Sequence, residues 1–150
     1  MNVPVNTIIP IASDHAGFEA KERVKKILRE HDITTIDYGT KDDESVDYPD
    51  FATLVAQAVN NGDHDTGILI CGSGQGMCMT ANKYPKVRAA LVWNEEVAKL
   101  SRQHNNANIL CLPGRMLNEE ELRAIVSSWL ESVFEGGRHQ RRVEKIKIQE

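Results

Sequence analysis

A cysteine followed directly by a glycine-rich loop is the feature of this chain best suited to chemistry. Cys71 ends the apolar run Gly67–Cys71, and the loop Gly72-Ser73-Gly74-Gln75-Gly76 precedes a helical pattern over residues 77–83. Alternating glycines leave backbone N–H groups free to converge on an anion. A cysteine just ahead of a helix N-terminus is in a position that favours its thiolate. The segment predicts an anion hole beside a reactive thiol.

Two other interpretations of this segment stay open: a plain tight turn for the loop and a core position for the cysteine. The loop could be a plain tight turn, and a dinucleotide-binding fingerprint would need its third glycine one residue later than Gly76. No P-loop lysine follows. A lone cysteine in an apolar run is usually a small core residue, which is how we interpret Cys78 and Cys111. Cys71 differs from them because it falls at the end of its run, where a crevice rim is expected.

Polar residues after the first apolar run form a second candidate group. Asp14 and His15 follow the run at residues 7–13 and could orient a substrate hydroxyl and bind a phosphate. Asp14 could equally cap the next helix. His104 lies in the polar segment 101–108, where a helical pattern gives way to an apolar run, and a surface turn would explain that polarity as well.

A basic tail, residues 135–150, stands out in an acidic chain. Its segment Glu135–Arg142 concentrates arginines, whose planar guanidinium groups suit phosphate. A charge run is often only a solvated face. Gly136 and Gly137, however, would let the segment leave its own domain and reach a neighbouring subunit.

Alternating short apolar runs and helical patterns indicate the fold. Strands are expected at residues 7–13, 34–37, 67–71, 89–92 and 109–112. A first helix is expected to begin at about residue 16, and others at about 47–59, 77–83, 95–103 and 118–133. Such alternation predicts a three-layer α/β, flavodoxin-like or Rossmann-like fold, in which helices cover both faces of a parallel five-stranded sheet. We expect the strand order 2-1-3-4-5. Ligands bind in such sheets beyond the strand ends at the switch point, so the loops after the first and third strands should face one crevice.

Length and composition exclude several classes of protein. The 150 residues, of which 41% are hydrophobic and 27% charged, predict a single domain over 1–150. A net charge of -4 and a pI near 5.7 argue against nucleic-acid binding by the whole chain. No apolar run approaches the roughly 20 residues of a membrane span, and Met1–Pro10 lacks the features of a signal peptide. The three cysteines lack metal-binding spacing, so free thiols and a cytoplasmic location are expected.

Taken together, these motifs resemble the type B ribose-5-phosphate isomerases, in the family that also contains galactose-6-phosphate isomerase subunits. The resemblance runs from Ser13 to Arg142 and is specific because many motifs occur in the same order. They are Ser13–Gly17, Asp47–Pro49, Cys71–Met77, Ala81–Lys83, Ser101–Asn105, Pro113–Arg115 and Glu135–Gln140.

The resemblance implies a role for each matching residue. Cys71 is the base that moves a proton between C2 and C1. Some members carry a glutamate in the glycine-rich loop instead, a position taken here by Met77. Asp14 and His104 open the sugar ring, and Ser73 supports the catalytic loop. Backbone groups of Gly72, Gly74 and Gly76, with Asn105, stabilise the enediolate oxygen. His15, Arg115, Arg138 and Arg142 hold the phosphate, and Tyr48 lines the pocket.

The function implied is interconversion of ribose 5-phosphate and ribulose 5-phosphate in the pentose phosphate pathway, with no cofactor and no metal. The expected partners are the phosphorylated sugar and a second copy of the chain, in a homodimer or dimer of dimers with shared active sites. Two alternatives stay open. One is an isomerase for allose 6-phosphate or galactose 6-phosphate, and the other is a non-catalytic module that binds a sugar phosphate or nucleotide. A redox role for Cys71 is disfavoured because no resolving cysteine lies nearby in sequence.

Overall fold

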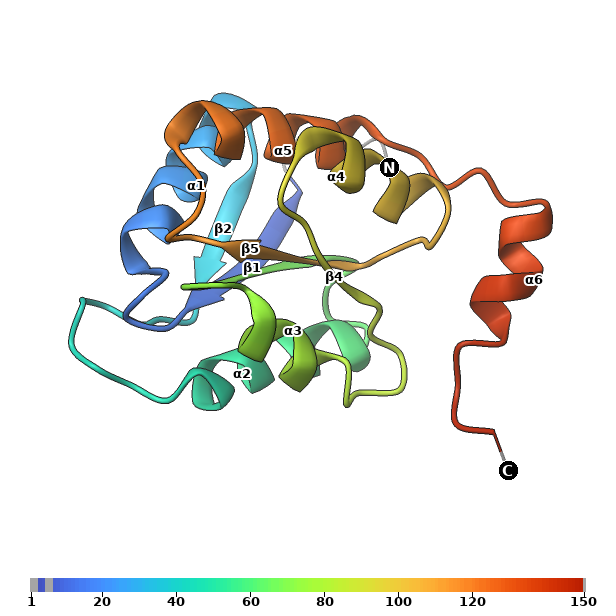
Figure 1. Cartoon of the computed structure of the whole chain (residues 1–150), viewed down its shortest axis with the longest axis horizontal. Helices are drawn as coiled ribbons and strands as arrows, with labels where there is room; N and C mark the ends of the chain where they lie inside the picture. Colours follow the sequence, from blue (N-terminus) through green and yellow to red (C-terminus); the bar gives the residue numbers. More distant parts are fainter. Residues whose placement is uncertain (1–2, 5–6, 150) are drawn as a thin grey trace.

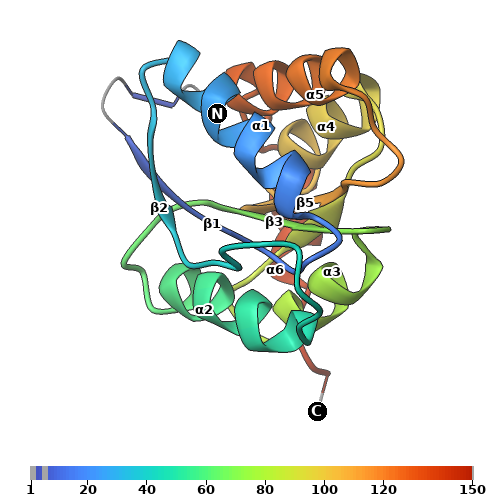
Figure 2. The same cartoon turned by 90° about the vertical axis from the view of Figure 1, so that its left-hand side faces the viewer.

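A five-stranded parallel sheet lies between two layers of helices in the computed structural model, which describes residues 3–4 and 7–149 (Figures 1 and 2). The ends of the predicted domain, residues 1–2 and 150, lie outside the described residues. The α/β class, the three layers and the parallel sheet are confirmed. The strands are β1 (Ile8–Ser13), β2 (Thr34–Asp37), β3 (Gly67–Cys71), β4 (Ala89–Leu91) and β5 (Ile109–Pro113).

Helices cover both faces of the sheet, and one short helix stands apart from it. One face carries α1 (Phe18–Glu30), α4 (Glu95–Gln103) and α5 (Glu119–Glu131). The other carries α2 (Tyr48–Asn60) and α3 (Gln75–Ala81). The last helix, α6 (Arg138–Glu144), extends beside the sheet in Figure 1, and the basic tail gave no prediction of it. Among the described helices, none has the length and apolar character needed to cross a membrane.

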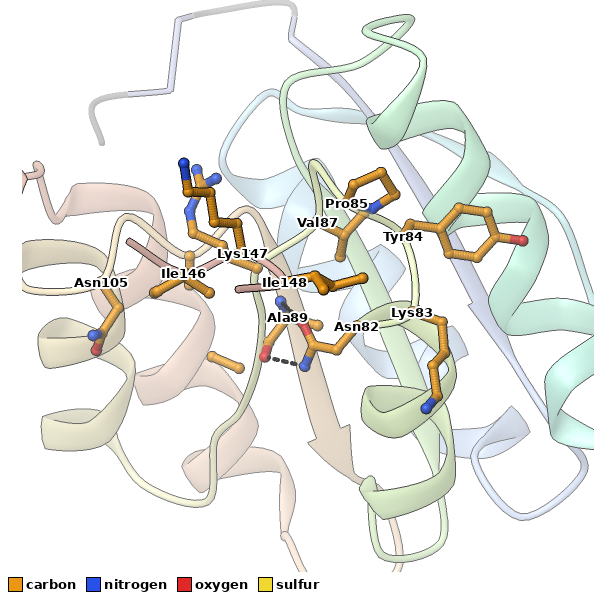
Figure 3. A pocket seen from close by; sticks show the side chains of 13 residues that line it. Asn82, Lys83, Tyr84, Pro85, Val87, Ala89, Asn105, Ile146, Lys147 and Ile148 are labelled. Atoms are coloured by element: carbon orange, nitrogen blue, oxygen red, sulfur yellow. Dashed lines mark hydrogen bonds between the residues drawn. The ribbon is translucent and has the colours of Figure 1, made fainter. Parts of the chain in front are cut away.

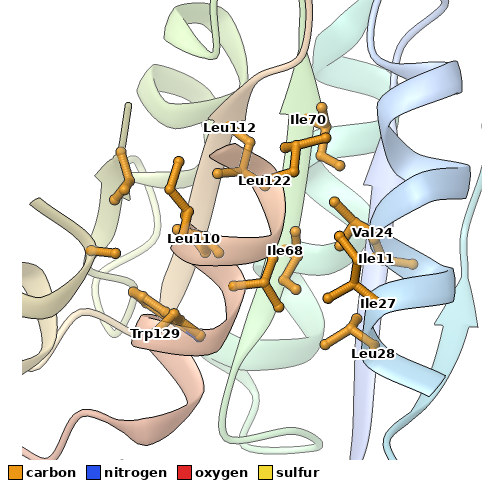
Figure 4. Packing of buried hydrophobic residues seen from close by; sticks show 14 of the residues in the cluster. Ile11, Val24, Ile27, Leu28, Ile68, Ile70, Leu110, Leu112, Leu122 and Trp129 are labelled. Carbon is orange, nitrogen blue, oxygen red and sulfur yellow. The ribbon is translucent and has the colours of Figure 1, made fainter. Parts of the chain in front are cut away.

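Alternate side chains of each central strand enter different cores, as expected when both faces of a strand are covered. Ile68, Ile70, Leu110 and Leu112 pack with α1, α4 and α5, together with Trp129 (Figure 4). The intervening residues of β3 and β5 pack with α2 and α3, and they are Leu69, Cys71, Ile109 and Cys111. The side chain of Cys71 is thereby directed toward the α2–α3 layer.

The strand order corrects the sequence prediction at one edge. The observed order is β2-β1-β3-β5-β4, whereas 2-1-3-4-5 was expected. All five residues of β5 are buried, whereas the three residues of β4 are only half-buried. The longer, wholly apolar strand therefore occupies the interior position beside β3, and the short strand forms the edge. This order brings the loop after β5 next to Cys71.

Local hydrogen bonding and backbone conformation explain why two helices begin away from their predicted positions. Helix α1 begins at Phe18 because the Asp14 carboxylate accepts the backbone N–H of Gly17 at 3.0 Å, which adds a turn before the helix. Helix α3 begins at Gln75, two residues before the prediction, because Gly74 ends the loop in a left-handed conformation. Asp47 occupies the N-cap position of α2, but its side chain makes no capping hydrogen bond.

A buried lysine ties α1 to the end of β2. The ammonium group of Lys21, which is fully buried, donates to Asp37 Oδ1 at 2.7 Å and to the carbonyl of Thr40 at 2.6 Å. Lys25 donates to the other carboxylate oxygen of Asp37 at 2.8 Å. Although partial burial raises the pKa of Asp37, the hydrogen bonds from the two lysines bring it below its usual value. The loop that leads to α2 is therefore anchored through a charged contact.

Asp37→Asn should destabilise the fold in a pH-dependent way. Loss of the carboxylate leaves Lys21 buried without its counter-charge, which should lower the free energy of unfolding by about 3 kcal/mol at pH 7. The lowered pKa means that the ionised carboxylate stabilises the fold fully above its unfolded-state pKa. The difference in the free energy of unfolding between wild type and variant should therefore become smaller below about pH 4. Urea unfolding of both proteins at a series of pH values measures this difference, and Asp32→Asn, at an exposed residue, is the control. A difference in the free energy of unfolding that does not change with pH would contradict the prediction.

Candidate active site

The end of β3 is held by hydrogen bonds to the loops on both sides of it. The backbone N–H of Asp14, after β1, donates to the carbonyl of Ile70 at 3.3 Å. On the β5 side, Gly114 N–H donates to the Cys71 carbonyl at 2.8 Å, and Arg115 N–H to the Gly72 carbonyl at 3.1 Å. Three loops that are distant in sequence therefore meet around Cys71, and the loops after β1 and β3 share a crevice.

Gly17 allows this close approach. A Cβ atom added there would lie 2.4 Å from the Ile70 carbonyl oxygen and 3.0 Å from the Cys71 backbone nitrogen. Any side chain at residue 17 would therefore push the start of α1 away from the end of β3. The small residue between Asp14 and α1 keeps Asp14 and His15 next to the thiol-bearing strand.

Cys71 differs from the two other cysteines by its place at a strand end. All three are free thiols. Cys111 is wholly buried in the middle of β5, and this burial raises the pKa of its thiol. The Cys78 thiol donates to the carbonyl of Ala89 at 3.4 Å, and its hydrogen bond with Cys111 lowers its pKa. Cys71, only 4% exposed, is the thiol that ends beside the glycine-rich loop.

The glycine-rich loop turns sharply and is covered on one side by an aromatic ring. Gly74 has φ of 76°, and a Cβ there would meet the Leu91 side chain at 2.4 Å. Ser73 is exposed, and its hydroxyl accepts the backbone N–H of Gln75 at 3.4 Å. A Cβ at Gly76 would meet the Tyr48 ring at 2.5 Å. Tyr48, the first residue of α2, therefore lies directly against this loop.

A polar pocket of about 370 Å³ adjoins the crevice. It is lined by His15 and Arg115, together with Glu19, Arg23 and Asp43. The Nδ1 atom of His15 accepts the backbone N–H of Val46 at 3.1 Å, so the neutral ring carries its proton on Nε2. The guanidinium groups of Arg23 and Arg115 and the imidazole of His15 can donate to an anion such as a phosphate, while Glu19 and Asp43 balance the arginine charges in the same pocket.

Arg23 is a pocket residue that the sequence analysis did not single out. It lies in α1 one helical turn after Glu19, so both side chains share the face that lines the pocket. Once the loop containing His15 is taken as part of a site, the i, i+4 spacing of Glu19 and Arg23 in the helix that follows is a sequence signal that indicates Arg23.

Four predicted site residues lie away from Cys71 within one chain: His104, Asn105, Arg138 and Arg142. His104 directly follows α4, four residues before Asn108. The backbone N–H of Gly67 donates to the carbonyl of Asn108 at 3.0 Å, which places this segment beside the start of β3. Gly67 begins β3 and Cys71 ends it, a separation of roughly 13 Å along a strand. His104 and Asn105 therefore lie toward the opposite end of the sheet. Both arginines are exposed on α6, one helical turn apart, beyond that end.

His104, Glu135 and His139 form a compact trio of metal-type donors at that end. The two imidazole rings are stacked, with centroids 4.3 Å apart and planes within 9° of parallel. A histidine nitrogen binds a metal through a lone pair in the ring plane, so two parallel stacked rings do not direct their lone pairs to one ion. Arg138 and Arg142 add positive charge nearby. The trio is therefore better arranged for contacts among its own side chains than for a metal.

A groove of about 910 Å³ lies next to Asn105 (Figure 3). Its lining combines the segment around β4 with Asn105 and with Ile146 and Ile148 from the tail. Ile148 is 89% exposed. The side chain of Asn82, just after α3, donates to the carbonyl of Ala89 in β4 at 2.9 Å and so ties the end of α3 to β4. An apolar groove at a sheet edge is a surface suited to another protein chain.

Comparison with known proteins identifies the family. The sequence pattern of the ribose/galactose isomerase family matches residues 9–146. A probable ribose-5-phosphate isomerase B from Mycoplasma genitalium is 51% identical over 138 residues, which cover 91% of each chain. The chain therefore belongs to the ribose/galactose isomerase family.

Solved structures of this family have the same fold. A ribose 5-phosphate isomerase from Thermotoga maritima superposes with a TM-score of 0.91 at 50% identity, covering 94% of this chain and 97% of the other. The Mycoplasma genitalium ribose-5-phosphate isomerase B, solved with bound ribulose-5-phosphate, gives a TM-score of 0.89 at 49% identity, with 95% of both chains covered. The resemblance expected from the sequence motifs is confirmed at the level of the family and the fold.

Gly74→Ala should disrupt the loop without unfolding the protein. A methyl group there meets Leu91 and is strained by the positive φ, so the N–H groups of the loop should shift, and the loss of one oxyanion donor typically costs about 10²–10³ in rate. Isomerase kinetics with ribose 5-phosphate measure the loss, with circular dichroism as a check of folding. Gly62→Ala is the matched control, because Gly62 has φ of 80° but open space around it. Equal activity of the two variants would contradict the prediction.

Proposed function

We propose that this chain interconverts ribose 5-phosphate and ribulose 5-phosphate, and that Cys71 is the base. The observation that carries the proposal is the meeting of Cys71, the glycine-rich loop and the His15–Arg115 pocket around the end of β3, in a member of an aldose–ketose isomerase family. A base, an anion-binding loop and a phosphate-binding pocket are the three parts that such a reaction requires, and the thiol of Cys71 would be the base.

The chemistry follows from the acidity of a C–H bond next to a carbonyl. The Cys71 thiolate takes the proton from C2 of the open-chain aldose, and the electron pair moves toward O1 to give an enediolate. The O2 hydroxyl proton moves to O1, which becomes the C1 hydroxyl, and the thiol returns its proton to C1 as the electron pair on O2 forms the C2 ketone. Backbone N–H groups of residues 72–76 stabilise the negative oxygen, and Ser73 holds the loop through Gln75. C2 is oxidised and C1 is reduced within the same molecule, so the reaction requires no external oxidant or redox cofactor.

The phosphate group binds and orients the substrate but does not react. His15 and Arg115 hold it in the pocket, and Tyr48 covers the glycine-rich loop beside the sugar. Binding energy from this non-reacting group can orient the sugar over Cys71. Asp14 contacts a sugar hydroxyl with the part of its carboxylate that does not cap Gly17.

The complete site requires a second copy of the chain. We assign ring opening to His104 and enediolate binding to Asn105, with additional phosphate contacts from Arg138 and Arg142. Because these four lie toward the opposite end of the sheet from Cys71, they act on the Cys71 of a partner subunit. The groove beside β4 is the proposed contact surface, and exposed Met79, Trp93 and Ile146 add apolar area for it. The assembly is a homodimer or a dimer of dimers.

The compartment is proposed from the thiols. Cys71, Cys78 and Cys111 are free, and the mechanism needs Cys71 reduced. We therefore assign the protein to the reducing cytoplasm.

Cys71→Ala should abolish isomerisation and leave substrate binding intact. Removal of the base should lower kcat for ribose 5-phosphate by about 10²–10⁴, whereas affinity for the unreactive ribitol 5-phosphate should stay near that of wild type. Conversion to ribulose 5-phosphate is followed with EDTA present, and allose 6-phosphate serves as the six-carbon comparison. Cys78→Ala is the matched control. Near-normal turnover by Cys71→Ala would remove Cys71 as the base, and tight binding without turnover by wild type would indicate a binding module.

A further inference from the structure

His104 is held by the segment that follows α5. Its Nε2 atom lies 3.3 Å from the Glu135 carboxylate oxygen Oε1. The backbone N–H of Glu135 donates to the carbonyl of Gln103 at 3.0 Å, and Gln103 is the residue directly before His104. Both the backbone and the side chain of Glu135 are therefore tied to the end of α4. The carboxylate is half-exposed and keeps this position without being packed into the core.

The face of the His104 ring is covered as well as its edge. The His139 ring stacks on it at a centroid distance of 4.3 Å. The Nε2 atom of His139 lies 3.9 Å from the same Glu135 oxygen. Partial desolvation, together with the nearby charges of His104 and Arg138, lowers the pKa of His139. A stacked ring over one face and a carboxylate at one edge leave His104 little freedom to rotate.

We propose that Glu135 is a positioning residue for ring opening and acts through His104. This inference rests on the function proposed above. In ring opening, His104 takes the proton of the O1 hydroxyl, C1=O forms as the C1–O4 bond breaks, and the imidazolium returns the proton to O4. The ring carries a positive charge between these two transfers. A carboxylate at 3.3 Å stabilises that charge and holds the ring edge on which it sits, as carboxylates do for catalytic histidines elsewhere.

The position of Glu135 links two parts of the site. Gly136 and Gly137 separate it from Arg138 and from the rest of α6. The segment that fixes His104 is therefore continuous with the helix whose arginines are proposed to hold the phosphate. A merely structural role for Glu135 would be to hold α6 in place, and its loss would then weaken phosphate binding. The positioning role affects turnover instead.

A double-mutant cycle separates these roles. The value of kcat/KM for ribose 5-phosphate is measured for wild type, Glu135→Leu, His104→Asn and the double variant. Misplacement of a catalytic group by about 1 Å can cost 10²-fold, so a loss of about that size is expected for Glu135→Leu. In the His104→Asn background the same substitution should cost almost nothing, because its effect passes through the missing ring. Affinity for ribitol 5-phosphate, which has no ring to open, should be unchanged.

Two matched variants complete the design. Glu131→Leu removes another exposed glutamate, at the end of α5, and should have wild-type kinetics. Glu135→Gln keeps an oxygen beside His104 but not the charge, and should retain more activity than Glu135→Leu.

Three outcomes would overturn the inference. Independent losses from the two substitutions would show that Glu135 does not act through His104. A parallel loss of ribitol 5-phosphate binding would show that it only holds α6. Impaired turnover in His104→Asn with normal turnover in Glu135→Leu would reject the role of Glu135 alone. Absence of ribose 5-phosphate turnover in wild type would instead reject the proposed function, and this inference with it.

Discussion

The backbone hydrogen bonds around the end of β3 are the contacts on which the rest of the site depends. The carbonyl of Ile70 accepts from the loop after β1, and the carbonyls of Cys71 and Gly72 accept from the loop after β5. These bonds satisfy the backbone groups that a parallel strand leaves free where its ladder ends. In doing so they bring a thiol, a glycine-rich loop and a polar pocket lined by His15 and Arg115 into one crevice. The chemistry is therefore positioned by the same bonds that end the strand.

This constraint also underlies our proposal that the site needs a second copy of the chain. The crevice lies at the carboxyl ends of the strands, whereas a helix that returns along the sheet delivers its last residues to the amino ends. Helix α4 delivers His104 to this end of the sheet. The tail that follows α5 starts beside His104 and leads into α6, which carries the two arginines. A single copy cannot bring these groups back to Cys71 without rearranging the sheet. In the proposed assembly, a second copy placed against the groove beside β4 would supply these groups to Cys71 with the fold unchanged.

Much of the fold and of the crevice could be predicted from the sequence. The bounds of β2, β3 and α4 were expected at the observed residues, and β3 has the clearest pattern because all five of its residues are buried. The exchange of β4 and β5 was not predictable from pattern alone, because pairing depends on which strand is buried on both faces. The early start of α3 depended on the backbone conformation of Gly74, which the letters Gly-Ser-Gly do not specify.

Contacts between distant segments were the least accessible to sequence reasoning. Helix α6 follows two glycines and has no buried residue, so it shows no apolar period. The approach of Glu135 to His104 joins the chain after α5 to the end of α4, and neither local pattern indicates it. Arg23 was missed for the same reason, because its pocket forms only when α1 packs beside the loop after β5. Residues that act through tertiary contacts need the structure to be found.

Subunit complementation tests the central claim that Cys71 and His104 act together from different chains. Cys71→Ala and His104→Asn, each impaired alone, are mixed under conditions that let dimers exchange subunits. A heterodimer then contains one site with both lesions and one site with neither. Random exchange makes half of the dimers mixed, so about a quarter of wild-type activity on ribose 5-phosphate is expected. Activity no higher than that of the two parents, with exchange verified by mass spectrometry, would contradict the shared site.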